Sequence, residues 1–354
     1  MTKMVAVKDL VPGDILADEV LSISGKVLLG KEVALTNRHI SLLNTWDIQS
    51  VFIDSDEEEM EEAENKDFVS NQFIVKEDQP SSNEYIRFNQ DYDSIVTNIV
   101  QSFDIIKQHR IIPVSQMKGN AGKIYSSIES NFEILNHLLV SDNNLADCIS
   151  RHSVMVAYFS GIIARQMNWS QQDIEGVTVA ALLHDIGSLV VDRKPISHKS
   201  AYLSETAGLL KLANGLSAEI ILGVVQDREY MNGTGFPRGT KGLQIHPYAR
   251  ILSIADNFHN YTYNEKGINP FPILELFKRE MYGKFDTDIC QTFISRVKDT
   301  LILNKVILSN NQEAEVIFFN KNNYEEPIVK CLDNQIIDLS KRKDLRISRI
   351  VTFN

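Results

Sequence analysis

The alternation of hydrophobic and polar positions predicts a small mixed module at the start of the chain. Within residues 1–54, short apolar runs are separated by turn residues such as Pro12-Gly13. Thr36 is a suitable N-cap for a helix that ends near Trp46. The runs predicted as strands are Val5–Val7, Ile15–Leu21, Lys26–Leu29 and Ser50–Asp54. We therefore predict an α+β module over residues 1–54, in which no residue suggests chemistry.

An acidic segment follows this module. From residue 54 to residue 67 the chain reads DSDEEEMEEAENKD, and Gln79-Pro80-Ser81-Ser82 interrupts any regular pattern further on. Such a composition is typical of a solvated linker rather than of a metal site. The sequence therefore predicts an acidic linker over residues 55–82.

Helical spacing of apolar residues then governs the chain from Asn83 to about residue 300. One helix is predicted to start at Asn83, and a second follows Pro113. The apolar face of the second helix is formed by Ile124, Ile128, Phe132, Leu135 and Leu138. We expect the helices of residues 83–140 to lead into a helical domain over residues 141–300.

Beyond residue 300 the hydrophobic period changes to two, which predicts antiparallel strands in a β appendage over residues 301–354. The predicted strands are Lys305–Leu308, Ala314–Phe319, Ile328–Leu332, Ile336–Leu339 and Ile347–Val351. The predicted fold is mainly α: a helical bundle with a small N-terminal α+β module and a small C-terminal antiparallel β appendage.

Charge and cysteine usage narrow the choice of partners and compartment. The net charge of −11 disfavours non-specific binding to nucleic acid or to an anionic membrane surface. Cys148, Cys290 and Cys331 lie far apart and form no CxxC pair, which argues against a disulfide framework or zinc finger. No run approaches the ~20 apolar residues of a membrane span. We expect a cytoplasmic protein without a DNA or membrane partner.

Candidate metal ligands stand at the ends of apolar helical stretches. The string VAALLHDIG ends in adjacent His184 and Asp185, which can reach the same ion because the backbone turns there. His152 lies in another apolar helix, and Asp256 ends a third apolar stretch. Each residue alone is more often a satisfied core or capping residue. Because unpartnered buried charges are costly, the set of four favours one bound divalent ion, with Fe, Mn and Zn all open.

A glycine-rich stretch over residues 231–251 is a second candidate. Its spacing predicts a compact loop whose backbone N–H groups come close to a neighbouring group. Arg238 and Lys241 add positive charge suited to a phosphate. A tight structural loop is the alternative. The residues that make it compact are Gly233, Gly235, Pro237, Gly239 and Gly242.

The ordered strings HSVMVA, LLHDIG, NGTGFPRGTKGLQIHPYARI and SIADNFHNYT resemble the HD-GYP family of metal-dependent phosphohydrolases. The resemblance covers roughly residues 145–300, and Phe236 stands at the tyrosine of the Gly-Tyr-Pro signature. It implies a helical bundle around two or three metal ions and hydrolysis of cyclic di-GMP by metal-activated water. It places His152, His184, Asp185 and Asp256 at metal positions, with His184 and Asp185 also catalytic. The implied ligand-binding loop comprises Gly235, Phe236, Pro237, Arg238 and Lys241.

Several other positions depart from the family pattern. The glutamate before the first histidine is replaced by Cys148, and the paired histidines before the signature loop are replaced by Asp227 and Arg228, while Glu229 is retained. The remaining departures are Ser188 for a lysine, Ser204 for a histidine, and Asn264-Glu265-Lys266-Gly267 for an arginine-bearing segment. The surviving ligands match a one-metal HD phosphohydrolase, because a two-metal centre needs ligands for ions ~3.5–4 Å apart.

Substitute ligands for a second ion remain open in the sequence. Asp227 is one, although Arg228 beside it opposes a cation, and Cys148, His198 and His259 are others. We expect a nucleotide-sensing or protein-interaction module of bacterial cyclic di-GMP signalling with little or no phosphodiesterase activity. The alternatives are an active metal-dependent phosphodiesterase and a scaffold without ligand. The expected partners are cyclic di-GMP or a related nucleotide and a signalling protein, and a homodimer is left open.

Overall fold

The computed structural model describes residues 2–21, 27–31, 33, 35, 39–40, 43, 48–54, 82–130, 133–141, 148–191, 199–264 and 267–352. The chain divides into two compact units, residues 1–78 and residues 79–354. The ends of the helix predicted from Thr36 to Trp46, and the predicted linker up to residue 81, lie outside the described residues.

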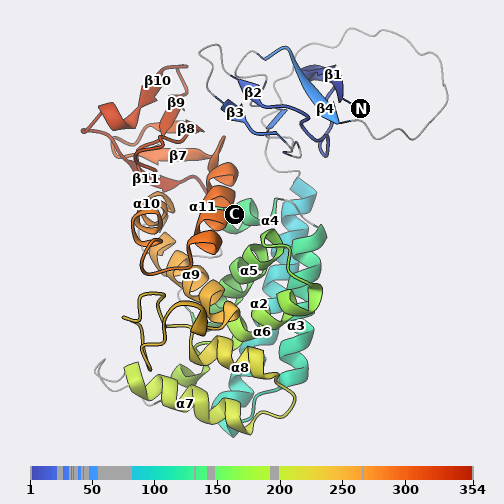
Figure 1. Cartoon of the computed structure of the whole chain (residues 1–354), viewed down its shortest axis with the longest axis vertical. Helices are drawn as coiled ribbons and strands as arrows, with labels where there is room; N and C mark the ends of the chain where they lie inside the picture. The colour runs from blue at the N-terminus through green and yellow to red at the C-terminus, as the bar shows by residue number, and fades with distance from the viewer. Residues whose placement is uncertain are drawn as a thin grey trace, which may run out of the picture. The chain divides into compact units, whose positions relative to one another are not determined.

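The first unit is built on two antiparallel strand pairs. Strand β1 (Thr2–Ala6) pairs with β4 (Ser50–Asp54), and β2 (Val20–Leu21) pairs with β3 (Val27–Leu29) (Figure 1). The first strand starts earlier than predicted, and Val7 opens the 3-10 helix η1 (Val7–Asp9) instead of continuing the strand. The unit has its own core of Val7, Leu10, Leu16, Val20, Leu35, Leu43 and Val51.

Helices make up most of the second unit. Their bounds are α2 (Ser82–His109), α3 (Val114–Ser130), α4 (Ile134–Val140), α5 (Ile149–Gln166), α6 (Gln171–Leu183), η3 (Ile186–Leu189), α7 (Lys199–Leu212), α8 (Ala218–Val225), η4 (Gly242–Gln244), α9 (Pro247–Thr262), α10 (Phe271–Glu280) and α11 (Thr287–Leu301). The helix predicted after Pro113 is in fact two helices, because α3 ends at Ser130 and α4 begins at Ile134. Its apolar pattern runs through the break because Ile128 and Leu135 face one core.

Helix α5 lies at the centre of the bundle. It packs against α2, α3, α6, α9 and α11, and nearly every residue from Ser153 to Ala164 is buried (Figure 1). The approach to α3 is close, because a Cβ added at Gly161 would lie 2.6 Å from the Ile128 side chain. Neighbouring helix starts are fixed by local capping: Ser170 accepts from the Asp173 amide at α6, and Pro247 occupies the first turn of α9. The helix ends that carry polar residues are thereby held in place.

A five-stranded antiparallel sheet completes the second unit. Its strands are β7 (Lys305–Leu308), β8 (Glu313–Phe318), β9 (Ile328–Cys331), β10 (Ile336–Asp338) and β11 (Ile347–Ile350), in the order β10-β9-β8-β7-β11. Val306, Val316 and Val329 bury one face of the sheet in the core shared with the helices. A two-stranded ribbon, β5 (Tyr263–Asn264) with β6 (Gly267–Ile268), follows α9. The predicted class, mainly α with a small C-terminal antiparallel appendage, is confirmed.

The sequence predicted three parts after the linker: connecting helices over residues 83–140, a helical domain over 141–300 and a β appendage over 301–354. All three lie within one compact unit. The finer boundaries near residues 140 and 300 stay a prediction. Among the described residues, no helix combines the length and the apolar character that crossing a membrane requires.

Candidate metal centre

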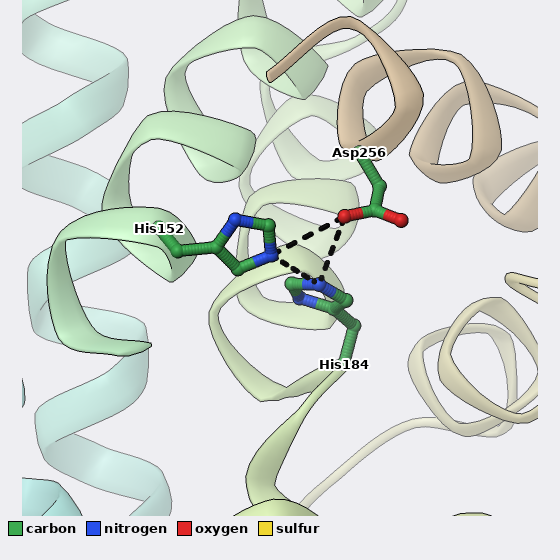
Figure 2. A group of neighbouring side chains, drawn as sticks. All are labelled: His152, His184 and Asp256. Atoms are coloured by element: carbon green, nitrogen blue, oxygen red, sulfur yellow. Dashed lines mark hydrogen bonds and ion pairs between the residues drawn. The ribbon is translucent and has the colours of Figure 1, made fainter. Parts of the chain in front are cut away.

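Three helices bring His152, His184 and Asp256 together. His152 lies in the first turn of α5, His184 directly follows α6, and Asp256 lies within α9. The His152 Nε2 atom is 3.1 Å from His184 Nε2 and 3.2 Å from Asp256 Oδ1, and His184 Nε2 is 3.7 Å from the same oxygen (Figure 2). Residues far apart in the sequence thus point their ligand-competent atoms at one place.

Asp185 faces this cluster with only one of its carboxylate oxygens. Its Oδ2 atom is 3.6 Å from His184 Nε2 and 3.8 Å from His152 Nε2. Its Oδ1 atom accepts a hydrogen bond from Arg228 Nη2 at 2.6 Å. All four predicted ligands are therefore neighbours, and Asp185 is shared between the cluster and a guanidinium group.

A second set of contacts orients the clustered side chains. His184 Nδ1 donates to the Ala181 carbonyl oxygen at 2.7 Å, which leaves Nε2 as the lone-pair nitrogen when the ring is neutral. His152 Nδ1 lies 3.0 Å from His259 Nδ1, and Asn260 Nδ2 donates to Asp256 Oδ1 at 2.8 Å. Partners of this kind fix ring orientation at metal sites and tune the ligands.

His259 and Asn260 were not recognised in these supporting roles from the sequence. His259 lies three residues after Asp256 and Asn260 four residues after it, so α9 places both on the Asp256 face. That spacing is a signal that sequence reasoning could have used. The Ala181 carbonyl carries no such signal, because every residue has one.

The electrostatics of the cluster favour positive charge beside its carboxylates. Burial lowers the pKa of the His184 imidazole, but the charges of Asp185 and Asp256 outweigh it and raise the pKa to about 10. Burial likewise opposes ionisation of Asp256, yet hydrogen bonds with the two histidines hold the pKa of its carboxyl well below the usual range. Burial and the neighbouring His152 lower the pKa of His259 to about 3, so that ring stays neutral. The cluster is suited to hold a cation.

Arg228 and Asp227 form a second charged pair beside the cluster. Burial raises the pKa of Asp227 to about 7 against the opposing charge of Arg228, whose Nε lies 3.8 Å from Asp227 Oδ2. Asp227 Oδ1 is buried without a hydrogen-bond partner among the described residues. The Arg228 guanidinium also lies 6.0 Å from the centroid of the Phe236 ring, at a cation–π distance. This arrangement places a fixed cation next to Asp185.

The glycine-rich loop is compact, but it uses its own backbone donors. The amides of Gly233, Phe236 and Gly242 donate to the carbonyl oxygens of Tyr230, Arg228 and Met231. The Arg238 amide donates to Glu229 Oε1 at 2.8 Å. These amides were expected to face a ligand, and the structure instead shows them bonded within the chain.

Gly235 is the position where the loop approaches the preceding backbone most closely. A Cβ there would lie 2.4 Å from the Tyr230 nitrogen and 2.5 Å from the Arg228 oxygen, so only glycine fits. The side chains of Arg238 and Lys241 are exposed. Pro237 and Arg238 line a cavity of about 300 Å³ against α7 and α8, together with Glu229 and Gln226. The geometry of Gly235 matches the alternative of a tight structural loop, and ligand binding by the loop stays a prediction.

The remaining departures from the family pattern lie at the edge of the cluster or outside it. Cys148 is exposed at the start of α5 and is absent from the group of close ligand atoms. The Ser188 hydroxyl donates to the Asp185 carbonyl oxygen, and Ser204 is exposed on α7. His198, Glu265 and Lys266 lie outside the described residues.

The donor set fits a divalent ion. Two imidazole nitrogens and one carboxylate oxygen lie within 4.8 Å of one another, and Asp185 Oδ2 supplies a further oxygen nearby. Mixed nitrogen and oxygen donors are typical of Zn²⁺, Mn²⁺ and Fe²⁺ sites. The structure thus contains a potential metal-binding cluster of His152, His184 and Asp256.

Comparison with known proteins agrees with this geometry. Residues 134–271 match the family described as HD domain, so the chain carries an HD domain that contains the cluster. A solved structure titled Bd1817, an HDG"Y"P protein from Bdellovibrio bacteriovorus, matches with a TM-score of 0.50 and 18% identity, over 84% of this chain and all of that one. That solved structure therefore shares the fold of this chain, and the family match places an HD domain over residues 134–271.

Two relatives are similar over part of their length. The cyclic di-GMP phosphodiesterase of Thermotoga maritima is 27% identical over 164 residues, covering 42% of this chain and 45% of that protein. The cyclic di-GMP phosphodiesterase PdeB of Borreliella burgdorferi is 22% identical over 211 residues, 55% of each chain. The chain thus spans about half the length of these relatives.

Proposed function

We propose that this protein binds cyclic di-GMP or a related nucleotide at a one-metal HD centre, with little or no phosphodiesterase activity, in bacterial signalling. The observation that carries the proposal is the 2.6 Å hydrogen bond from Arg228 to Asp185 Oδ1. The guanidinium occupies the side of Asp185 that a second ion would need, and two like charges at this separation repel strongly in a partly buried site.

The proposed ligands of the single ion are His152, His184 and Asp256, with Asp185 as the fourth. Fe²⁺, Mn²⁺ and Zn²⁺ all suit this set. A divalent ion there would supply Lewis-acid polarisation of a phosphate oxygen. His184 and Asp185 are the proposed catalytic residues of any residual hydrolysis, because Asp185 lies between the cluster and Arg228 and its Oδ2 atom is 3.6 Å from His184 Nε2.

The names of the two relatives, both cyclic di-GMP phosphodiesterases, support a nucleotide as the ligand. We further propose a cytoplasmic location and a protein partner in signalling, since the chain's charge of −11 argues against nucleic acid and anionic membrane surfaces. A homodimer is compatible with this function.

An active phosphodiesterase is the second candidate. The observation that favours it is the close convergence of His152, His184 and Asp256, which is the arrangement that a metal-dependent hydrolase requires. Loss of one electrostatic contact to the leaving oxygen commonly costs ~10²–10³ in rate. A one-metal centre without a second clamp is therefore expected to turn over slowly.

The test combines metal content, binding and turnover on the full chain. We expect Mn²⁺-loaded protein to retain about one ion per chain, to bind cyclic di-GMP in calorimetry, and to yield no linear product by chromatography. Robust hydrolysis that disappears in the His184→Ala, Asp185→Ala variant would establish the second candidate. Absence of any nucleotide binding by the metal-loaded protein would leave a protein-interaction role.

A further inference from the structure

Arg228 is held in place on three sides. Its Nη2 atom donates to Asp185 Oδ1 at 2.6 Å, its Nε atom lies 3.8 Å from Asp227 Oδ2, and its guanidinium lies near the Phe236 ring. The side chain nevertheless remains 28% exposed. A fixed, partly accessible guanidinium is preorganised to bind an anion, because it loses little side-chain entropy on binding.

The guanidinium and the metal-binding cluster are joined through one carboxylate. Asp185 Oδ1 contacts Arg228, while Asp185 Oδ2 lies 3.6 Å from His184 Nε2 and 3.8 Å from His152 Nε2. The two oxygens of a single carboxyl group therefore separate a fixed cation from the place where a metal ion is expected. An anion small enough to lie beside Asp185 can contact both.

We propose that Arg228 and the metal-binding cluster together bind a terminal phosphate group, so that the site prefers a phosphomonoester nucleotide over a cyclic phosphodiester. This inference rests on the proposed function for the existence of a bound ion. It deepens that function by ranking its candidate ligands: a related nucleotide with a terminal phosphate binds more tightly than cyclic di-GMP, which also binds.

The donor count on Arg228 gives the chemical reason. A guanidinium carries five N–H groups, of which Nη2 uses one on Asp185. The buried Nε makes no hydrogen bond among the described residues and lies 3.8 Å from Asp227 Oδ2. Among the described residues, Arg228 donates its side-chain hydrogen bond through Nη2, which leaves the Nη1 donors for a ligand. The guanidinium fork prefers to bind two oxygens of one phosphate at once.

Phosphate esters differ in how many oxygens they can offer. A phosphomonoester has three free oxygens and a charge of about −1.5 to −2, whereas a diester has two free oxygens and a single charge. One oxygen on the ion and two on the arginine fork use all three oxygens of a monoester. A diester must give up one of these contacts, and it carries less charge to be attracted by the two cationic groups.

The test compares two ligands that share base and sugar. Calorimetry on the Mn²⁺-loaded full chain is performed with GMP and with guanosine 3′,5′-cyclic monophosphate. We expect GMP to bind at least ~10-fold more tightly, which corresponds to the ~1.4 kcal/mol or more that one charge-assisted contact contributes. This ratio is measured on the unmodified protein, so it does not depend on whether any variant folds.

Variants of Arg228 then assign the preference to its guanidinium. Arg228→Gln is expected to weaken GMP about tenfold or more while changing the cyclic nucleotide less than about threefold, and Arg228→Lys should fall between because it keeps the charge and loses the fork. Metal content measured by elemental analysis should not fall in either variant. Arg279→Gln is the matched control, because that arginine side chain is 70% exposed on α10.

The outcomes separate this inference from the proposed function. If the cyclic nucleotide binds as tightly as GMP, or if Arg228→Gln weakens both equally, the monoester preference is wrong while nucleotide binding stands. If neither GMP nor cyclic di-GMP binds the metal-loaded protein, the proposed function fails and the inference fails with it.

Discussion

The metal-binding cluster and the glycine-rich loop were both predicted as functional from the sequence, yet they satisfy their polar groups in different ways. In the cluster, the Nε2 atoms of His152 and His184 and the Asp256 carboxylate converge at 3.1–3.7 Å. In the loop, backbone amides such as those of Phe236 and Arg238 donate to the chain itself. The cluster leaves ligand atoms pointing at a shared place, whereas the loop closes on itself.

The two regions therefore have different roles. The convergent imidazole and carboxylate groups favour a bound cation, and the charges of Asp185 and Asp256 that raise the pKa of His184 act in the same direction. A loop whose amides are already bonded stabilises structure, and its residue Phe236 contacts Arg228, which in turn donates to Asp185. The loop is therefore expected to position Arg228, and the cluster is expected to bind the metal ion. Four predictions test this division.

The largest effect is expected from Gly235→Val in the loop. The new side chain would lie 2.4–2.5 Å from the backbone of Arg228, Glu229 and Tyr230, which cannot move aside. We expect the free energy of unfolding in urea to fall by on the order of 3 kcal/mol or more. Gly208→Ala in α7 is the control, since its Cβ meets nothing within 4 Å. A Gly235→Val protein as stable as the parent would contradict the packing role.

The next effect is expected from His184→Ala in the cluster. Loss of a buried imidazole that lies within reach of three other ligand groups should weaken Mn²⁺ binding by at least ~10²-fold. Competition with a fluorescent chelator measures this change. Cys148→Ser should bind metal as the parent does, because Cys148 is exposed and outside the cluster. Equal loss in both variants would show that the cysteine is a ligand.

An intermediate effect, on metal content, is expected from Arg228, which lies between the loop and the cluster. Arg228→His removes the positive charge from Asp185 Oδ1 and offers an imidazole in its place. At excess Mn²⁺, metal content should rise from about one toward about two ions per chain, because the barrier to a second ion is then removed. Arg228→Gln removes the same charge without a new ligand and should stay near one. Parent protein that already holds two ions would refute the one-metal centre.

The smallest effect is expected from Arg238→Ala combined with Lys241→Ala. Both side chains are exposed, so their charges are screened by solvent and salt. The free energy of unfolding should change by less than about 0.5 kcal/mol, and affinity for cyclic di-GMP by less than about threefold. A tenfold loss of affinity at unchanged stability would instead support the sequence-based prediction that the loop binds phosphate.

The sequence alone was sufficient for the class of fold and for most element positions. Long apolar-periodic segments predicted the helices, and the change to a period of two located the C-terminal strands within a residue of their observed ends. The break between α3 and α4 was missed because both segments bury the same apolar face, so periodicity continues across it. Hydrophobic spacing reports which face is buried and is insensitive to where the backbone turns.

The sequence also determined which residue types were available at the site, since His152, His184, Asp185 and Asp256 stand at the polar edges of apolar stretches. How these side chains are shared depends on the fold: Arg228 binds one oxygen of Asp185, and His259 supports His152. Only the fold could also show that the loop amides are bonded internally. The physical reason is that hydrogen bonds and ion pairs depend on distances of a few ångströms between segments 43 to 107 residues apart, which no local pattern encodes.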